Sequence, residues 1–187
     1  MKQIRIIAAL VIAVFMFSGF WSGESPEKLR SERKEASQET LWLLYKYAPE
    51  AKDMIARSYG YATFSNLGIN ALFFSAEGGK GLAKINGSGK TIYMNMASGG
   101  LGFGLGVKDF RIIFLFEDKK AFDYFVEQGW EANAQADAAA KAGADGGALN
   151  AAVTVAPGVR IYKLTQNGLA LQATIQGTKY WADSDLN

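Results

Sequence analysis

Two tight groups of acidic residues are the first candidates for chemistry in this chain, Glu117-Asp118 and Asp183-Ser184-Asp185. Paired carboxylates can act as general acid and base. The chain has no histidine and no cysteine, which excludes a Ser-His-Asp triad, a thiolate nucleophile, a zinc cluster built on those ligands and a disulfide framework. Capping of a helix explains the first acidic group, and a solvated C-terminus explains the second. We therefore predict that the chain is not an enzyme and that it needs no metal or cofactor.

Glycine-rich segments raise the possibility of a nucleotide site, but their spacing does not fit one. Residues 87–91 read Gly-Ser-Gly-Lys-Thr and end like a P-loop, yet position 84, where the first glycine of that motif belongs, is Lys84. No G-x-G-x-x-G pattern occurs in residues 99–106. A polar hairpin loop is the better interpretation of residues 87–91.

A group of basic residues, Arg30, Arg33 and Lys34, could contact an anionic lipid surface. Glu32 and Glu35 lie among them, so a solvated helix face with local ion pairs is the alternative. The chain has 20 Lys and Arg against 18 Asp and Glu, and residues 1–23 contain two of the bases and no acid. The remainder is therefore neutral, which argues against nucleic acid as a partner.

Aromatic residues could add a second kind of lipid contact. Trp42, Trp130, Tyr180 and Trp181 could form a belt at a membrane surface. The alternative is that they lie in the core or at its rim, as most aromatic residues do.

In residues 100–107 every second residue is glycine. With the period of two of a β-strand, Leu101, Phe103 and Leu105 share one face and are candidate lipid contacts. The other face, formed by Gly100, Gly102, Gly104 and Gly106, has no side chains. Such a face indicates close approach of a helix, another sheet, a ligand chain or a protein partner.

The first 23 residues predict an export or anchoring segment. A short basic region with Lys2 and Arg5 precedes an apolar run, as in a secretory signal peptide. No pair of small residues three apart marks a cleavage site, and residues 4–21 are about long enough to span a membrane, so an uncleaved anchor is a second interpretation. A buried core helix is the third. Either of the first two places the domain, residues 24–187, outside the cytoplasm, in the periplasm or at the envelope.

The elements that position these residues follow from periodicity and turn signals. Ser25-Pro26 begins a helix that is charged at first and apolar nearly all round over residues 41–47, which we expect to be buried. Pro49 starts a short second helix, with Ala51, Met54 and Ile55 facing inward. Asp118 caps a third helix that ends at Gly129.

Strands are expected at residues 61–65, 71–76, 81–86, 91–97, 101–108, 111–116, 151–156, 159–165 and 169–176. Residues 111–116 are apolar on both faces and should be central in the sheet. Residues 131–138 alternate polar residues with alanine, which favours a strand by period and a helix by propensity. The turn at 166–168 makes the last two strands a hairpin. The predicted fold is α+β, a curved, mostly antiparallel β-sheet or partial barrel with N-terminal helices and one inserted helix.

The order of these segments resembles that of SYLF domains, a family of lipid-binding modules. Residues 60–68 are similar to the family's opening G-Y-A-x-F-P-x-x-G, with Ser65 in place of proline, and residues 78–81 are similar to its glycine hairpin. Residues 162–177 are similar to its closing motif, and Asn187 matches its terminal asparagine. One departure lies in residues 142–148, where many relatives have an arginine that this chain lacks. The matching positions that we expect to be structural are Gly60, Tyr61, Phe64, Gly68, Gly79, Gly81, Gly100, Gly102, Gly104, Gly106, Gly168 and Gly177.

The resemblance implies phospholipid or phosphoinositide binding, no cofactor and no catalytic residues. Two functions from different classes follow for residues 24–187. The first is a lipid-binding domain at the cell envelope that meets phospholipid or a membrane surface. The alternative is an envelope structural or protein-interaction domain that docks an unknown partner through the glycine face.

Overall fold

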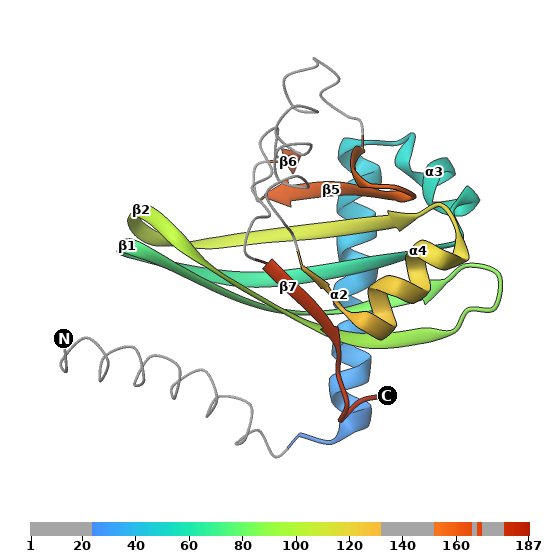
Figure 1. The fold of residues 1–187 in the computed structure, drawn as a ribbon, viewed down its shortest axis with the longest axis horizontal. Coiled ribbons are helices and arrows are strands. Elements are labelled where there is room, and N and C mark those ends of the chain that lie inside the picture. The colour runs from blue at the N-terminus through green and yellow to red at the C-terminus, as the bar shows by residue number, and fades with distance from the viewer. Residues whose placement is uncertain (1–23, 132–151, 166–167, 170–177) are drawn as a thin grey trace.

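The computed structural model describes residues 24–131, 152–165, 168–169 and 178–187, with side chains except those of 66–77, 99–109 and 168–169. Figure 1 shows the order of the elements. The helical elements are α2 (Pro26–Tyr47), α3 (Ala51–Arg57), α4 (Lys119–Asp123) and the π-helix η1 (Tyr124–Gln128). The strands are β1 (Gly60–Ile85), β2 (Thr91–Phe116), β3 (Trp130–Glu131), β4 (Val153–Ala156), β5 (Val159–Thr165), β6 (Gly168–Leu169) and β7 (Thr178–Ala182).

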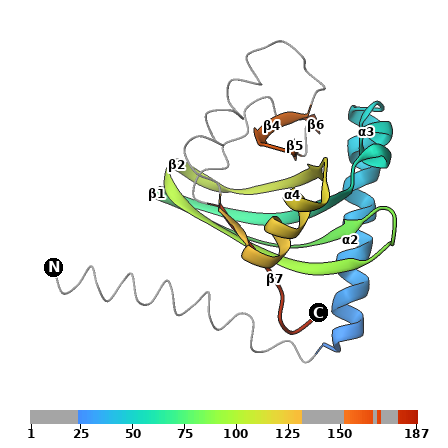
Figure 2. The same ribbon diagram turned by 45° about the vertical axis from the view of Figure 1, so that its right-hand side comes forward.

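The strands form one curved, antiparallel sheet, which confirms the predicted α+β fold (Figures 1 and 2). Strand β1 pairs with β2 along nearly its whole length. Strand β5 pairs with Phe110–Phe116 of β2, and β7 pairs with Met94–Ser98 of the same strand. The apolar segment at 111–116 thus lies between β1 and β5, as its two apolar faces predicted.

Six of the predicted strands are merged into two, and this corrects the sequence analysis. Strands β1 and β2 are each 26 residues long, and residues 78–81 lie inside β1 rather than in a hairpin turn. Leu72 pairs with Gly104 and Phe74 pairs with Leu101, so one residue of β1 faces two residues of β2. This β-bulge lies near the middle of the ribbon that β1 and β2 form.

The ribbon folds over, and its two ends lie against each other (Figures 1 and 2). A Cβ atom added to Gly81 would lie 2.1 Å from the carbonyl oxygen of Thr63 and 2.5 Å from the ring of Phe64. A Cβ added to Gly60 would lie 2.6 Å from the carbonyl oxygen of Lys84. These are close backbone contacts that leave no room for a Cβ atom at Gly60 or Gly81.

Two hydrophobic cores lie on the two faces of the folded ribbon. In the first, Phe122 and Phe125 from α4 and η1 pack on the even-numbered phenylalanines of β2 and on Tyr180. The ring centroid of Phe125 lies 4.9 Å from those of Phe114 and Phe116, with the rings tilted. In the second, Leu44 of α2 and Ile55 of α3 pack on the other face of the sheet. The sheet is therefore covered by helices on both sides.

Helix boundaries agree with their sequence signals. Ser25 caps α2 by accepting a hydrogen bond from the Lys28 amide, with proline at the first position, and Asp118 caps α4 through the Ala121 amide. Gly129, with φ of 71°, ends the third helical segment as predicted. Among the described residues, no helix combines the length and the apolar character that crossing a membrane requires. The segment 1–23, residues 132–138 of the predicted strand at 131–138, and Gly177 lie outside the described residues.

The close contact at Gly81 gives a first prediction. Gly81→Ala should destabilise the protein by about 1–3 kcal/mol, because its methyl group cannot be accommodated without a backbone shift. The measurement is the midpoint of urea unfolding. Gly87→Ala is the matched control, since a Cβ at Gly87 meets no atom within 4 Å. Equal stability of the two variants would show that the ribbon ends are not in contact.

Candidate functional site

The three basic residues predicted to face lipid point in different directions from α2. Arg33 is 7% exposed, whereas Lys34 lies on the exposed face. Arg30 is partly exposed and donates from Nε to the carbonyl oxygen of Leu186 at 2.9 Å. Only Lys34 therefore fits the prediction without a competing contact among the described residues.

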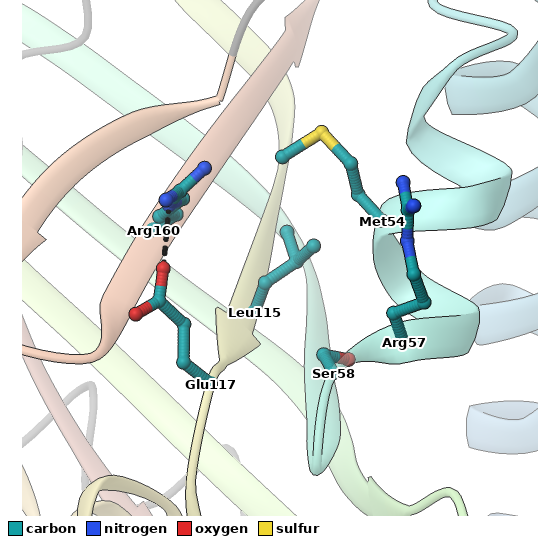
Figure 3. A pocket seen from close by; sticks show the side chains of 6 residues that line it. All are labelled: Met54, Arg57, Ser58, Leu115, Glu117 and Arg160. Atoms are coloured by element: carbon teal, nitrogen blue, oxygen red, sulfur yellow. Dashed lines mark ion pairs between the residues drawn. The ribbon is translucent and has the colours of Figure 1, made fainter.

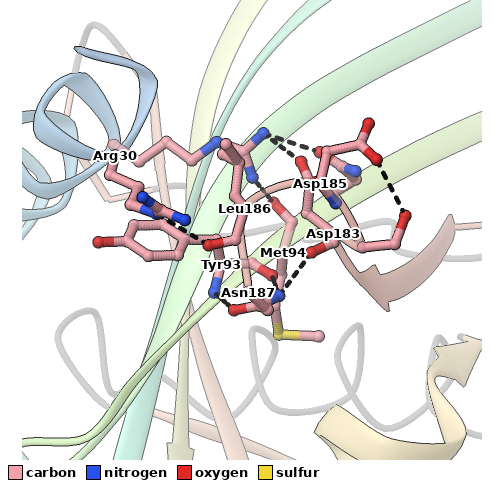
Figure 4. A network of polar contacts seen from close by, with 10 residues as sticks. Arg30, Tyr93, Met94, Asp183, Asp185, Leu186 and Asn187 are labelled. Carbon is pink, nitrogen blue, oxygen red and sulfur yellow. Dashed lines mark hydrogen bonds and ion pairs between the residues drawn. The ribbon is translucent and has the colours of Figure 1, made fainter. Parts of the chain in front are cut away.

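Arg33 is the centre of a buried polar network, and Figure 4 labels two of its partners, Met94 and Asp183. Its guanidinium donates to the carbonyl oxygen of Met94 at 2.8 Å and to Asp183 Oδ2 at 2.5 Å. A third bond reaches Asn95 Oδ1 at 3.2 Å. The prediction that Arg33 contacts lipid is wrong for this fold, because its charge is neutralised inside the protein.

The C-terminal segment is solvated only in part, since Ser184 and Asp185 are exposed whereas Asp183 is buried, and it is fastened to β2. The side-chain amide of Asn187 accepts from the Tyr93 amide at 2.8 Å and donates to the Tyr93 carbonyl at 2.8 Å. It also donates to the carbonyl of Asp183 at 2.7 Å. Asn187 thus bonds to β2 as the backbone of a neighbouring strand would. With Arg30 and Arg33, these contacts form what we call the C-terminal clasp, residues 183–187 held between α2 and β2.

The charge of Asp183 is part of this clasp. Burial alone would raise the pKa of Asp183, but the hydrogen bond and the charge of Arg33 outweigh it and hold that pKa below the usual aspartate value. The carboxylate is therefore ionised wherever the protein is folded near neutral pH. A buried ion pair of this kind has a structural role, and nothing about it requires catalysis.

The four aromatic residues of the predicted belt separate into two groups. Tyr180 is fully buried and Trp130 packs against the same core, so the core alternative holds for both. Trp42 is 61% exposed, which corrects the expectation that 41–47 is buried all round. Its ring lies 5.6 Å from Lys46 Nζ, which is also 5.6 Å from the ring of Tyr47.

The outer face of α2 near its C-terminal end therefore presents an aromatic and basic patch, which we call the Trp42 patch (Trp42, Lys46 and Tyr47). Trp181 is 38% exposed on β7, a different element. Sequence periodicity could have placed Trp42 outside, because Arg33, Ser37, Thr40 and Leu44 define the buried stripe and Trp42 is off it.

A pocket of about 240 Å³ lies where α3 ends and where β1, β2 and β5 come together (Figure 3). Its lining residues are Met54, Arg57, Ser58, Leu115, Glu117 and Arg160. Arg160 Nε lies 2.8 Å from Glu117 Oε1, as an ion pair that lacks hydrogen-bond alignment. No local sequence signal marks this pocket, because its residues come from segments more than 100 positions apart.

The glycine strand is described only by its backbone. Gly100, Gly104 and Gly106 pair with Ser75, Leu72 and Asn70 of β1, and the bulge contains Gly102 and Phe103. The bulge interrupts the period of two on which a single glycine face was predicted. The side chains of Leu101, Phe103 and Leu105, and the surroundings of the glycines, lie outside the described part of the chain, so their predicted lipid contacts stay predictions.

The other motif positions lie in regular structure. Tyr61 and Phe64 are buried in opposite cores. Gly68 pairs with Lys108, Gly79 with Met96, and Gly168 with Thr165, where β5 and β6 form the predicted hairpin. Within the described ranges, no three acidic side chains gather closely enough to hold a metal ion.

A relative of this chain matches it along most of its length. It is 38% identical over 145 residues to Beta cell expansion factor A of Aeromonas veronii, a match that covers 76% of this chain and 53% of that protein. This chain and that protein are homologous. The chain spans about half the length of its relative, and no family model matches it.

The Arg33–Asp183 pair gives a second prediction. Asp183→Asn should lower the free energy of unfolding at pH 7 by about 3 kcal/mol, because the buried guanidinium of Arg33 loses its counter-charge. Asp185→Asn is the control, since Asp185 is exposed and makes no ion pair among the described residues.

The same pair predicts a pH dependence. The pKa of Asp183 is lower in the folded protein than in the unfolded chain, where it is about 3.9. The ionised carboxylate therefore stabilises the fold above about pH 3.9, and this stabilisation is lost as the pH falls through the lower pKa of the folded state. The difference in stability between the wild type and Asp183→Asn, measured by urea unfolding from pH 7 to pH 3, should therefore shrink below about pH 4. A constant difference would contradict an ionised Asp183 in the native state.

Proposed function

We propose that this chain is a non-enzymatic, SYLF-type domain that binds phospholipid membranes at the cell envelope. The observation that carries the proposal is the Trp42 patch. Trp42 exposes 61% of its surface on a helix that otherwise follows a normal buried stripe, and a lysine lies over its ring. An aromatic ring beside a lysine suits the boundary between water and lipid, where the ring enters the interface and the ammonium stays with the headgroups.

Several further observations support the proposal. The residues similar to SYLF domains include Gly60 and Gly81, which the folded ribbon requires. The acidic groups at 117–118 and 183–185 are occupied by capping and ion pairing. In this proposal, the positive charge that attracts anionic lipid comes from Lys46 and Lys34 rather than from Arg33.

The Trp42 patch gives a third prediction. Trp42→Ala should weaken binding to vesicles of phosphatidylglycerol and phosphatidylethanolamine about tenfold or more, because burial of a large aromatic side chain contributes about 1.5–3 kcal/mol. The measurement is co-sedimentation with increasing lipid.

Tyr124→Ala is the matched control for this experiment. Tyr124 is an aromatic residue exposed to 60%, and it lies on η1, which packs against the opposite face of the sheet. The Tyr124→Ala variant should bind vesicles as the wild type does. Equal loss in both variants would mean non-specific adsorption, and no loss in either would refute the Trp42 patch as the contact surface.

Export is a separate proposal, because it rests on residues 1–23. A fusion of residues 1–30 to a reporter that is active only outside the cytoplasm should be active. Leu10→Arg together with Val14→Arg should abolish that activity, since charges in the apolar run prevent membrane insertion. A silent wild-type fusion would contradict export.

A further inference from the structure

The pocket between α3 and β5 has an uneven distribution of charge. It contains two guanidinium groups, Arg57 and Arg160, and one carboxylate, Glu117, which leaves one net positive charge. Figure 3 shows Arg160 and Glu117 on one side and Arg57 on the other, with Leu115 between them. The two guanidinium groups thus lie on opposite sides of the apolar side chain of Leu115, which forms part of the pocket floor.

Arg57 is held in place while its donors stay available. Its Nε donates to the carbonyl oxygen of Asp53 at 3.2 Å, one turn back in α3. Its two terminal nitrogens make no hydrogen bond or ion pair with any described residue. A guanidinium fixed at Nε, with a free pair of donors at the mouth of a pocket, is pre-organised to bind two oxygens of one anion.

The apolar part of the pocket is also held in place. Met54 Sδ accepts a hydrogen bond from the hydroxyl of Tyr162 at 3.3 Å, and Leu115 is 2% exposed in the second core. The pocket therefore combines a rigid apolar floor with cationic walls. Inorganic phosphate would leave this floor without a partner.

We infer that this pocket binds a phosphodiester that carries an apolar group, with Arg57 as the main contact to the phosphate oxygens. A phosphodiester has one negative charge, which matches the net charge of the pocket. This inference rests on the proposed function in one respect, namely that the source of the phosphodiester is a phospholipid headgroup. In keeping with that source, α3 lies beside the end of α2 that carries the Trp42 patch (Figure 1).

A role for Arg57 in the helix alone is the simpler alternative. A basic residue in the last turn of α3 complements the helix dipole. That role needs only the charge and not the pocket, and Glu117 and Arg160 would then be irrelevant to any ligand. The two interpretations give different results for variants at positions 57, 52 and 117.

The experiment titrates the full chain with dibutyl phosphate, a soluble phosphodiester with two short apolar chains, by calorimetry. Arg57→Gln should weaken binding at least tenfold. Lys52→Gln is the matched control, since it removes the same charge from an exposed position of the same helix outside the pocket, and it should change binding less than twofold. Glu117→Gln should strengthen binding several-fold, because it frees Arg160 from its ion pair. Equal effects of Arg57→Gln and Lys52→Gln, or weaker binding in Glu117→Gln, would overturn the inference.

Vesicles of phosphatidylglycerol separate the lipid from a soluble ligand. Loss of both vesicle and soluble binding in Arg57→Gln supports a headgroup site. Loss of soluble binding alone overturns the lipid source. If the wild type binds dibutyl phosphate through Arg57 but binds no vesicles, the proposed function fails and the pocket remains. If vesicle binding depends on Trp42, while the binding of neither the vesicles nor the soluble phosphodiester depends on Arg57, the pocket inference fails and the proposed function remains.

Discussion

The contact between the two ends of β1 is the constraint on which the rest of the structure depends. The carbonyl oxygen of Thr63 lies 2.1 Å from the position that a Cβ atom at Gly81 would take, so the folded-over ribbon needs glycine there. Because the ribbon folds, a single long hairpin forms two faces that need cover. One face is closed by α4 and η1, and the other by α2 and α3. The helices that precede and follow the ribbon in the sequence are thus the elements that cover its two apolar faces.

The orientation of α2 follows from polar contacts as much as from apolar ones. Arg33 and the C-terminal clasp hold its first half, and Ser37 accepts a buried hydrogen bond from Thr63 at 2.8 Å. Leu44 anchors its second half in the core. A helix fixed along this stripe has no freedom to turn Trp42 inward. The exposure of Trp42 is therefore set by the fold. Single exposed apolar side chains are common, so the functional interpretation rests on Lys46 lying over the Trp42 ring rather than on exposure alone.

The sequence allowed the local elements to be predicted, because their signals are local. The Ser25-Pro26 start of α2, the Asp118 cap and the apolar strand at 111–116 each depend on neighbouring residues, and each is present in the structure. The merged strands were not predictable in this way. Glycines near 78–81 look like a turn to any local rule, and only the approach of Thr63 explains why they lie in a strand. Arg33 was misassigned for the same reason, since its partner Asp183 is 150 positions away.

The candidate site likewise has one part that local sequence signals indicate and one part that only the folded structure brings together. Trp42 was recognised as a possible membrane contact, whereas the pocket of Arg57 and Arg160 depends on how α3 and β5 meet. The most direct test of the account is the environment of Trp42 in the full chain when vesicles are added. The difference in tryptophan fluorescence between the wild type and Trp42→Phe isolates that residue. The account predicts that this difference signal shifts to shorter wavelength and is quenched by brominated phospholipid. A difference signal that stays unchanged at saturating lipid would contradict it.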